Sequence, residues 1–187
     1  MTDQTPVARV AAMIEEDAWS MTALRVVREL ALPDWWLVAG FVRCLVWDRL
    51  QGKAERTRPG DIDVVFYDPS SPAEADASYQ RALERAAPSY PWEVFNQAHM
   101  HVYNGDAPYI DSVDAFSRWA ETVSTVGVSL GEDDRVRLAA PCGLGDLLAM
   151  RIRLNPHPDA QRDVFERRLV KKGWSAIWPG VRLVSTE

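Results

Sequence analysis

A chain of 187 residues with 47% hydrophobic and 26% charged residues has a globular composition, which excludes an intrinsically disordered protein. The net charge of −6 argues against broad, non-specific binding to nucleic acid, which requires a basic surface. The two cysteines, Cys44 and Cys142, lie far apart and in no metal-binding motif, so we predict reduced thiols, with a disulfide as the alternative. The N-terminal segment has acidic residues where a signal peptide needs an apolar core, and no apolar run is long enough to span a membrane. We therefore predict a soluble, cytoplasmic protein.

The N-terminal part of the chain alternates between helical and extended patterns. Apolar residues at helical spacing predict one long or two short helices over residues 6–31, and Pro33 ends this region. The apolar segment "WWLVAG" at residues 35–40 predicts a short strand, and a helical pattern follows over residues 41–52. A polar, basic loop then leads into a predicted strand, "DIDVVFYD", at residues 61–68.

The middle of the chain is more polar. Residues 71–90 begin with Ser-Pro and continue as an exposed helix. Residues 91–104 are too polar on one face for a buried helix, and we predict a long extended segment there. A short helix follows over residues 112–121, capped by Ser112 or Asp111.

The C-terminal part combines a hairpin with helices. Two alternating runs across a Gly-Glu-Asp-Asp turn predict a hairpin over residues 125–141. Helical patterns cover residues 143–154 and 159–178, split by "NPHP". This order of elements indicates an α+β fold with a small mixed sheet flanked by helices. We predict a single domain over residues 1–187, made of an N-terminal helical part, a catalytic core and a C-terminal helical part at residues 1–33, 34–140 and 141–187.

Two aspartates stand one residue apart at the start of a predicted strand. Because side chains alternate along a strand, Asp61 and Asp63 point to the same side, where two anions repel each other unless a cation accompanies them. Carboxylates on adjacent strands can hold the metal pairs that are used for in-line displacement at phosphorus. The alternative interpretation is a polar beginning of the strand after Pro59 and Gly60.

The junction between the first strand and its helix is a second candidate feature. Gly40 lets a phosphate approach the backbone, and free amides at the start of a helix favour an anion. Arg43 lies one turn into the helix and can reach back toward a phosphate, or it is a surface arginine. Together with the two aspartates, this junction favours a functional site over a structural one.

Glu93 is the candidate for a third carboxylate, because it lies between apolar neighbours on the next extended segment. It would be a metal ligand or a base, and the alternative interpretation is an exposed strand residue. Asp111, Asp114 and Glu121 are further candidates in less suitable contexts.

The segment "NQAHMH" carries polar side chains near these motifs. His99 and His101 alternate onto one face of the predicted extended segment, but two such ligands do not make a zinc site. Asn96 and His101 are therefore either hydrogen-bond partners of a substrate or structural residues.

Basic residues occur in two segments. Lys53, Arg56 and Arg58 precede the aspartates, and one of them could contact a triphosphate although most such charges are solvated. The later segment "ERRLVKK", at residues 166–172, predicts the exposed face of a C-terminal helix rather than a nucleic-acid-binding surface.

The segment "VAGFVRCLVWDRLQG" followed by "GDIDVVFYD" resembles the glycine turn and Asp-x-Asp strand of the DNA polymerase β nucleotidyltransferase superfamily. The chain from Trp35 to Trp178 resembles a bacterial nucleotidyltransferase-like family whose substrate is generally unassigned. This resemblance rests on several motifs in one order: "GFVRCLVWD", "GDIDVVFYD", "NQAHMH", "WAETVSTVGV", "APCGLGDLL" and "KKGWSAIWP".

The resemblance implies a polymerase-β-type fold with a small mixed sheet. It implies that Asp61 and Asp63 bind Mg²⁺ or Mn²⁺ and that Gly40 lies under the triphosphate of an NTP. Our first hypothesis adds Arg43 as a further phosphate contact and Glu93 as a third metal ligand or base. The implied reaction transfers a nucleoside monophosphate from an NTP to an acceptor hydroxyl and releases pyrophosphate.

The sequence departs from the superfamily pattern at three points. Ala39 stands where the first glycine of the turn usually occurs, which tightens the phosphate turn. Cys44 replaces the aspartate that follows arginine in CCA-adding enzymes, which argues against that specific activity. Asp61 follows Gly40 by 21 positions, a longer spacing than in the compact CCA-type motif.

Two functional hypotheses follow. The first is a metal-dependent nucleotidyltransferase whose acceptor is a small molecule or a protein rather than RNA, because the chain is acidic. The second is a nucleotide-binding or protein-interaction module that keeps the fold without turnover.

Overall fold

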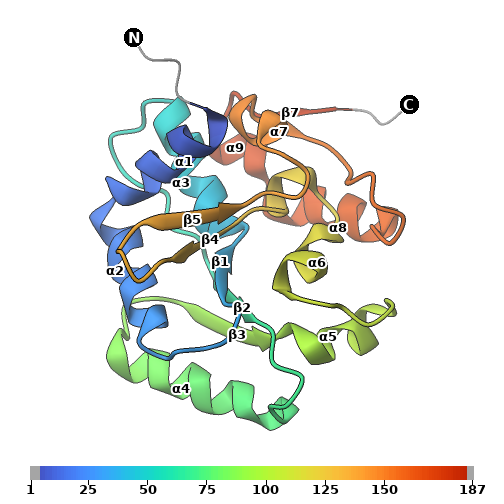
Figure 1. The fold of residues 1–187 in the computed structure, drawn as a ribbon. Helices are drawn as coiled ribbons and strands as arrows, with labels where there is room; N and C mark the ends of the chain where they lie inside the picture. The colour runs from blue at the N-terminus through green and yellow to red at the C-terminus, as the bar shows by residue number, and fades with distance from the viewer. Residues whose placement is uncertain (1–4, 185–187) are drawn as a thin grey trace.

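The structure is a computed structural model that describes residues 5–184 (Figure 1). The predicted helical region near the N-terminus consists of two short helices, α1 (Pro6–Glu15) and α2 (Ala18–Arg28). Both begin at a side-chain cap, since the Thr5 hydroxyl accepts a hydrogen bond from the Ala8 amide and the Asp17 carboxylate accepts one from Ser20. The outermost residues of the predicted domain, 1–4 and 185–187, lie outside the described part of the chain.

A mixed sheet forms the centre of the molecule. Its strands are β1 (Trp36–Val38), β2 (Ile62–Phe66), β3 (Trp92–Asn96), β4 (Gly127–Leu130) and β5 (Val136–Ala139), in the order β3-β2-β1-β4-β5. The strands β2 and β3 run parallel and the other neighbours run antiparallel, with Leu37 of β1 opposite both Val64 and Val128. The predicted α+β fold with a small mixed sheet is confirmed.

The two faces of this sheet are covered differently. On one face, Ile62, Val64 and Phe66 of β2 join a large buried cluster with α1, α2 and α3 (Gly40–Leu50). On the other face, Val65 joins a smaller cluster that includes Phe116 of α6 (Ser112–Ser117). Because Asp63 alternates with the residues of the large cluster, its side chain lies on the face with the smaller cluster.

The middle of the chain contains more helix than the pattern predicted. After the 3₁₀ turn η1 (Ala73–Ala75), α4 (Asp76–Ala86) packs along β3. The extended segment predicted over residues 91–104 is wrong beyond β3, because α5 (Gln97–Asn104) follows at once.

The side chain of Asn96 explains this change from strand to helix. Its Oδ1 atom accepts a hydrogen bond from the Ala98 amide and so caps α5, which ends at Gly105 in the left-handed conformation (φ 74°). Since these residues are helical, His99 and His101 do not alternate onto one face as we predicted.

Asp111 is the residue that caps α6. Its Oδ1 accepts a hydrogen bond of 2.6 Å from the Asp114 amide, while Ser112 is the first residue inside the helix. The hydroxyl of Ser112 instead donates to the Asp34 carbonyl. The 3₁₀ turn η2 (Thr122–Ser124) leads from this helix to β4, and the predicted hairpin of β4 and β5 is confirmed.

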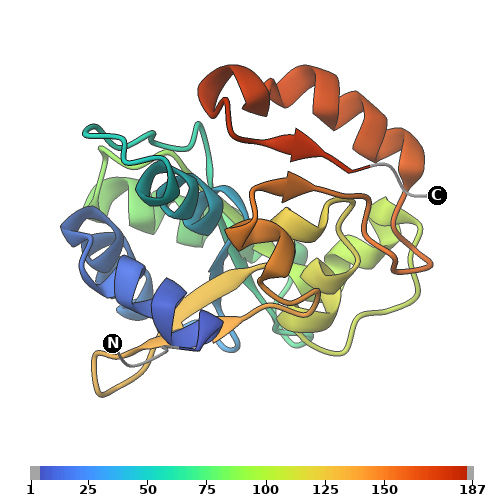
Figure 2. The same cartoon turned by 90° about the horizontal axis from the view of Figure 1, so that it is seen from above.

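The C-terminal part is less helical than expected. The predicted helix over residues 143–154 is wrong after α7 (Gly145–Leu148), because Met150 adopts a positive φ of 52° and the chain continues into β6 (Arg151–Ile152). The helices α8 (Arg162–Lys172) and α9 (Trp174–Ile177) follow, and β7 (Arg182–Leu183) pairs in parallel with β6. Figure 2 shows β7 lying alongside β6.

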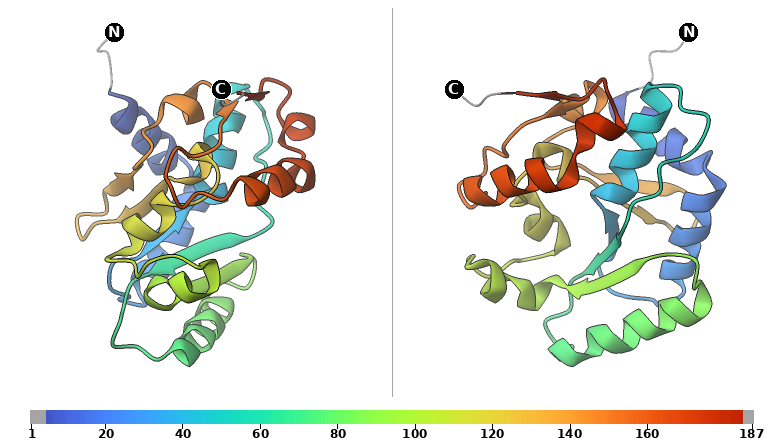
Figure 3. Two further views of the ribbon diagram at one scale, coloured as in Figure 1. Left: turned by 90° about the vertical axis from the view of Figure 1, so that its right-hand side faces the viewer. Right: turned by 180° about the vertical axis from the view of Figure 1, so that it is seen from behind.

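Packing joins this C-terminal part to the sheet. Trp47 of α3 makes edge-on contacts with Trp174 and Trp178, and Figure 3 shows α9 beside α3. The buried carboxylate of Asp48 accepts hydrogen bonds from the indole of Trp178 and from Thr57, in the loop before β2. One buried cluster thus contains residues from the N-terminal, central and C-terminal parts, and the single domain stays a prediction. None of the helices in residues 5–184 is long and apolar enough to cross a membrane.

Candidate active site

The carboxylates of Asp61, Asp63 and Glu93 lie at the N-terminal ends of β2 and β3. Asp61 directly precedes β2, and Asp63 pairs in register with Glu93 of the parallel strand β3. Side chains paired in register on neighbouring strands point to the same face, so Asp63 and Glu93 are neighbours. The fold therefore brings three carboxylates together at the N-terminal ends of β2 and β3. The alternation of the chain predicted the common side of Asp61 and Asp63, whereas the position of Glu93 follows from the parallel register.

These carboxylates influence one another electrostatically. Burial of Asp63, reinforced by the negative charges of Asp61 and Glu93, raises the pKa of Asp63 to about 6. Lys172 and Arg168 of α8 act in the opposite direction, and the ammonium of Lys172 lies 3.7 Å from the Asp61 carboxylate. Two cations from α8 thus partly balance the charge of the carboxylates.

The donor atoms suit a hard divalent cation. Carboxylate oxygens are the ligands that Mg²⁺ prefers. The pKa of Asp63 is raised first by burial and then by repulsion from Asp61 and Glu93, and a cation would relieve this repulsion. Within residues 5–184 no three histidine, cysteine or acidic side chains are arranged to enclose a metal ion. Mg²⁺ commonly uses one or two carboxylates together with water and substrate phosphates, so Asp61 and Asp63 fit this ion without a third protein ligand.

The raised pKa of Asp63 has a consequence for stability. The folded protein keeps the Asp63 proton up to about pH 6, whereas the unfolded chain releases it near the ordinary value of 3.8. Ionisation of Asp63 therefore lowers the free energy of unfolding as the pH rises through this interval. We therefore expect the free energy of unfolding of Asp63→Asn, relative to that of the parent, to rise by about 1–3 kcal/mol between pH 4 and pH 7.5. Urea denaturation in the presence of EDTA measures this difference. A constant difference between the two proteins over this range would contradict the expectation.

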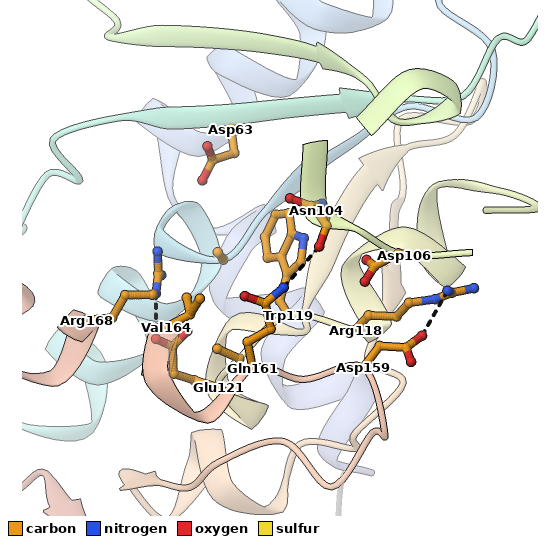
Figure 4. A pocket seen from close by; sticks show the side chains of 12 residues that line it. Asp63, Asn104, Asp106, Arg118, Trp119, Glu121, Asp159, Gln161, Val164 and Arg168 are labelled. Atoms are coloured by element: carbon orange, nitrogen blue, oxygen red, sulfur yellow. Dashed lines mark hydrogen bonds and ion pairs between the residues drawn. The ribbon is translucent and has the colours of Figure 1, made fainter. Parts of the chain in front are cut away.

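A pocket of about 270 Å³ opens beside Asp63 (Figure 4). Its walls come from β2, the end of α5, the segment after α6 and the beginning of α8. The lining residues are Ala39, Asp63, Asn104, Asp106, Arg118, Trp119, Ala120, Glu121, Asp159, Gln161, Val164 and Arg168. The pocket brings the ring of Trp119 together with four acidic side chains and two arginines, and each arginine is already paired with a carboxylate. An anionic ligand with a planar group therefore needs a metal cation beside it in this space.

Glu121 and Arg168 form the charged wall of this pocket. The Glu121 side chain is fully buried, and its Oε1 atom accepts a hydrogen bond of 2.5 Å from Nε of Arg168. Its Oε2 atom is also buried and has no partner within the described residues. Asp111 and Asp114 are excluded as third carboxylates, since the first caps α6 and the second pairs with Arg118.

The segment "ERRLVKK" is therefore more than an exposed helix face. Arg168 and Lys172 are four residues apart on α8, so they lie on the same side of the helix and point to Glu121 and Asp61 respectively. Our prediction that residues 166–172 only face solvent is wrong for these two residues. Their spacing of one helical turn was the signal in the sequence.

The junction of β1 and α3 is strained at its alanine. Ala39 adopts φ 51° and ψ −106°, and its amide donates a 2.8 Å hydrogen bond to the Val126 carbonyl. Gly40 begins α3, and a Cβ there would meet Pro59 at 3.5 Å, an ordinary contact. The conformation that favours glycine is thus required at Ala39 rather than at Gly40.

We expect Ala39→Gly to stabilise the protein by about 1 kcal/mol, because glycine adopts a positive φ without a steric cost. Urea denaturation measures the effect. Ala12→Gly inside α1 is the matched control and should destabilise by about 1 kcal/mol, since its backbone is helical. Equal destabilisation by both changes would show that Ala39 is not strained.

Arg43 does not lie where we predicted it. Its guanidinium is buried between the rings of Trp47 and Trp174, and it donates a 3.0 Å hydrogen bond to the hydroxyl of Ser124. Because these contacts bury the guanidinium, the interpretation of Arg43 as a surface arginine is wrong, and the predicted contact with a phosphate finds no support in this position.

Two further predicted binding residues have structural roles. The buried side chain of Asn96 is hydrogen-bonded to the backbone of Asp68 and Ala98, so it is not available to a substrate. His101 packs edge-on against Tyr109, its Nδ1 atom is buried without a partner in the described chain, and it does not line the pocket.

The basic loop before β2 is also largely structural. Arg56 pairs with Asp17, bonds to the hydroxyl of Ser20 and stacks on Trp19, while Lys53 lies 3.6 Å from Asp48. These contacts secure the loop that leads to Asp61. No contact points them toward the pocket.

The mixed sheet, with an Asp-x-Asp pair beside a strand–turn–helix junction, defines the class of nucleotidyltransferases with a polymerase-β-type fold. The chain belongs to a family described as nucleotidyltransferase, whose sequence model matches residues 25–183. It is therefore a nucleotidyltransferase. The family resemblance stated from the motifs is confirmed.

Solved structures support the same assignment. One NMR structure, described as revealing a CCA-adding enzyme head domain, is 33% identical, has a TM-score of 0.85 and covers 95% of both chains. A CCA-adding enzyme in complex with CTP is 16% identical with a TM-score of 0.60, and a tRNA-processing enzyme complex is 19% identical with a TM-score of 0.52. The chain covers 43% and 42% of those two proteins, so these likenesses concern the fold. A comparison with curated protein sequences found no significant match.

Proposed function

We propose that this nucleotidyltransferase is metal-dependent and transfers a nucleoside monophosphate from an NTP to an acceptor hydroxyl. The observation that carries this proposal is the group of carboxylates at Asp61, Asp63 and Glu93 beside an open pocket, where burial and then repulsion from the other two carboxylates raise the pKa of Asp63. The similar CCA-adding enzyme folds in complex with CTP and with ATP support an NTP as the substrate.

Each part of the site has a role in this proposal. Asp61 and Asp63 would hold Mg²⁺ or Mn²⁺, and Glu93 would act as a further ligand or as the base. The bound cation would neutralise phosphate charge and favour ionisation of the acceptor hydroxyl. Arg168 and Lys172 supply positive charge beside the carboxylates, where the triphosphate of an NTP would lie. Gly40, at the start of α3, remains a proposed phosphate contact.

The reaction would be an in-line displacement. The acceptor oxygen forms a bond to the α-phosphorus, and the bond from this phosphorus to the bridging oxygen of the β-phosphate breaks. Pyrophosphate leaves with the electron pair of that bond, and the proton of the hydroxyl passes to a carboxylate of the site. The chain contributes mainly position and charge to this step.

A second function has one observation in its favour. No three-ligand group for a metal occurs within residues 5–184, which would suit a module that binds NTP without transferring it. Tight NTP binding without transfer to any acceptor in a broad panel would support this function over the first.

Calorimetric titration of NTPs with and without Mg²⁺ tests the site. We expect binding by the parent to need Mg²⁺ and to disappear in Asp61→Asn/Asp63→Asn. Glu74→Gln/Glu84→Gln is the matched control, since it removes two exposed negative charges around α4 and should bind NTP normally. Failure of the parent to bind any NTP would contradict the proposal, as would equal binding by the aspartate variant.

A further inference from the structure

A second groove on the surface is rich in arginine. It lies between the segment after β6 and the short sheet of β6 and β7. Figure 1 shows β7 near the top of the view. Its lining residues are Arg151, Arg153, Leu154, Asn155, Pro156, His157, Ala160, Arg182, Leu183 and Val184. None of the lining residues is acidic. We call the groove lined by these residues the arginine groove.

The arginines of this groove are placed next to one another. Arg151 of β6 and Arg182 of β7 are partners in register, and both are exposed. Like charges opposite each other on neighbouring strands destabilise a sheet, so this pairing has a cost in the absence of an anion. Arg153 follows Arg151 by two residues, and in an extended chain side chains two residues apart point to the same side.

Counter-charges within the described chain do not balance this cluster. Arg151 and Arg153 share the single carboxylate of Asp146, at 3.1 and 3.0 Å. Arg182 forms no ion pair with any residue between 5 and 184. The groove thus carries net positive charge on a protein whose overall charge is −6.

The arginine groove adjoins the active-site pocket. Leu154 of the groove forms an isolated β-bridge with Glu121 of the pocket. The segment that follows β6 lines both spaces, with His157 and Ala160 on the groove and Asp159 and Gln161 on the pocket. A ligand in the groove therefore lies next to the pocket that contains Asp63, separated from it by one segment of chain.

Arginine suits the recognition of phosphate, because its planar guanidinium donates two parallel hydrogen bonds to phosphate oxygens. Several arginines along a groove fit a chain of successive phosphates better than one small anion. We propose that the arginine groove binds the phosphodiester backbone of a nucleic-acid acceptor strand, whose 3′-terminal hydroxyl then reaches the pocket at Asp63. This inference rests on the proposed function for the role of the strand as acceptor, while binding of the strand is independent of it. It replaces the expectation, drawn from net charge, that the acceptor is a small molecule or a protein.

Fluorescence anisotropy with labelled single strands of RNA and of DNA tests this inference on the full chain, without NTP. We expect the parent to bind, and affinity to fall roughly 20-fold between 50 and 200 mM salt, as three phosphate contacts on a single strand predict. In Arg151→Gln/Arg182→Gln, binding should weaken at least about 10-fold at low salt, with a correspondingly smaller salt dependence. The comparison of the affinities for RNA and for DNA shows which nucleic acid is the ligand.

The control Arg81→Gln/Arg85→Gln removes the same charge from the exposed face of α4 and should bind the strand like the parent. NTP binding and the thermal unfolding midpoint of Arg151→Gln/Arg182→Gln should also be unchanged, which separates loss of the groove from misfolding. Asp63→Asn should still bind the strand, so failure of the catalytic proposal does not affect this measurement.

Three results would overturn the inference. They are absence of strand binding by the parent, equal weakening in the α4 control, and binding of inorganic polyphosphate as tightly as of either strand. A transfer assay addresses the acceptor role, because a strand ending in a 3′-deoxynucleotide should bind equally and should not be extended. Extension of that blocked strand would exclude the 3′-hydroxyl as the acceptor.

Discussion

Replacement of Asp63 by asparagine is expected to lower nucleotidyl transfer by at least about 10³-fold, the largest effect of any single change in the site. The substitution keeps the shape of the side chain but removes the negative charge that would hold the divalent cation against the triphosphate. Pyrophosphate release and incorporation of labelled nucleotide into the acceptor measure the loss, at saturating Mg²⁺ and NTP.

A matched control for this experiment lies on the same strand–loop segment. Asp68→Asn also removes one negative charge, but the Asp68 carboxylate accepts hydrogen bonds from the amide and hydroxyl of Ser70 just beyond β2, away from the pocket, and its variant should keep nearly full activity. Both variants should unfold at temperatures no lower than the parent by more than a few degrees. If a folded Asp63→Asn protein kept the activity of the parent, the assignment of Asp63 as a metal ligand would be wrong.

Removal of Arg168 is expected to destabilise the fold by about 2–4 kcal/mol. Glu121 is fully buried, while the side chain of Arg168 is 35% exposed, so Arg168→Ala leaves a buried carboxylate without its partner. A buried unpaired charge has a much larger cost than a broken surface ion pair. Urea or guanidinium denaturation at neutral pH measures the change in the free energy of unfolding.

The same helix offers the control for this prediction. Arg167 pairs with Asp163 on the exposed side of α8, where both side chains are 67% exposed, and Arg167→Ala should cost at most about 1 kcal/mol. The double variant Glu121→Leu/Arg168→Leu should recover most of the stability lost in Arg168→Ala, because it removes the unpaired charge. Similar small losses for Arg167→Ala and Arg168→Ala would contradict a buried ion pair.

Local sequence patterns were sufficient to predict most of the helices and strands and the common side of the two aspartates. The period of two in "DIDVVF" placed Asp61 and Asp63 on one side of the chain, and the helical spacing near the N-terminus predicted α1 and α2. Glu93 could be placed on the next strand, but only the parallel register showed that it lies beside Asp63. These features depend on residues close together in sequence or on one adjacent strand pair.

Two kinds of feature were not predicted: a helix whose cap was hidden by a competing local pattern, and contacts between distant segments. Asn96 before "QAH" is a recognisable N-cap, yet the alternation of polar residues favoured a strand and hid α5. Arg43, three residues after Gly40, fits the pattern of a phosphate contact or of a surface arginine, and only the packing of α9 shows that Trp174 covers it. The partnership of Glu121 with Arg168 joins residues 47 positions apart, which no local pattern can indicate.

That separation also bears on how the protein is made. During synthesis, Glu121 emerges from the ribosome before α8, and at rates of roughly 5–20 residues per second the chain waits several seconds for Arg168. Until then, burial of Glu121 in the sheet layer would be unfavourable, so the wall of the pocket cannot close on the nascent chain. Docking of α8 is therefore the step that completes the wall of the active-site pocket, and the protein acquires its substrate site only as its C-terminal helices assemble.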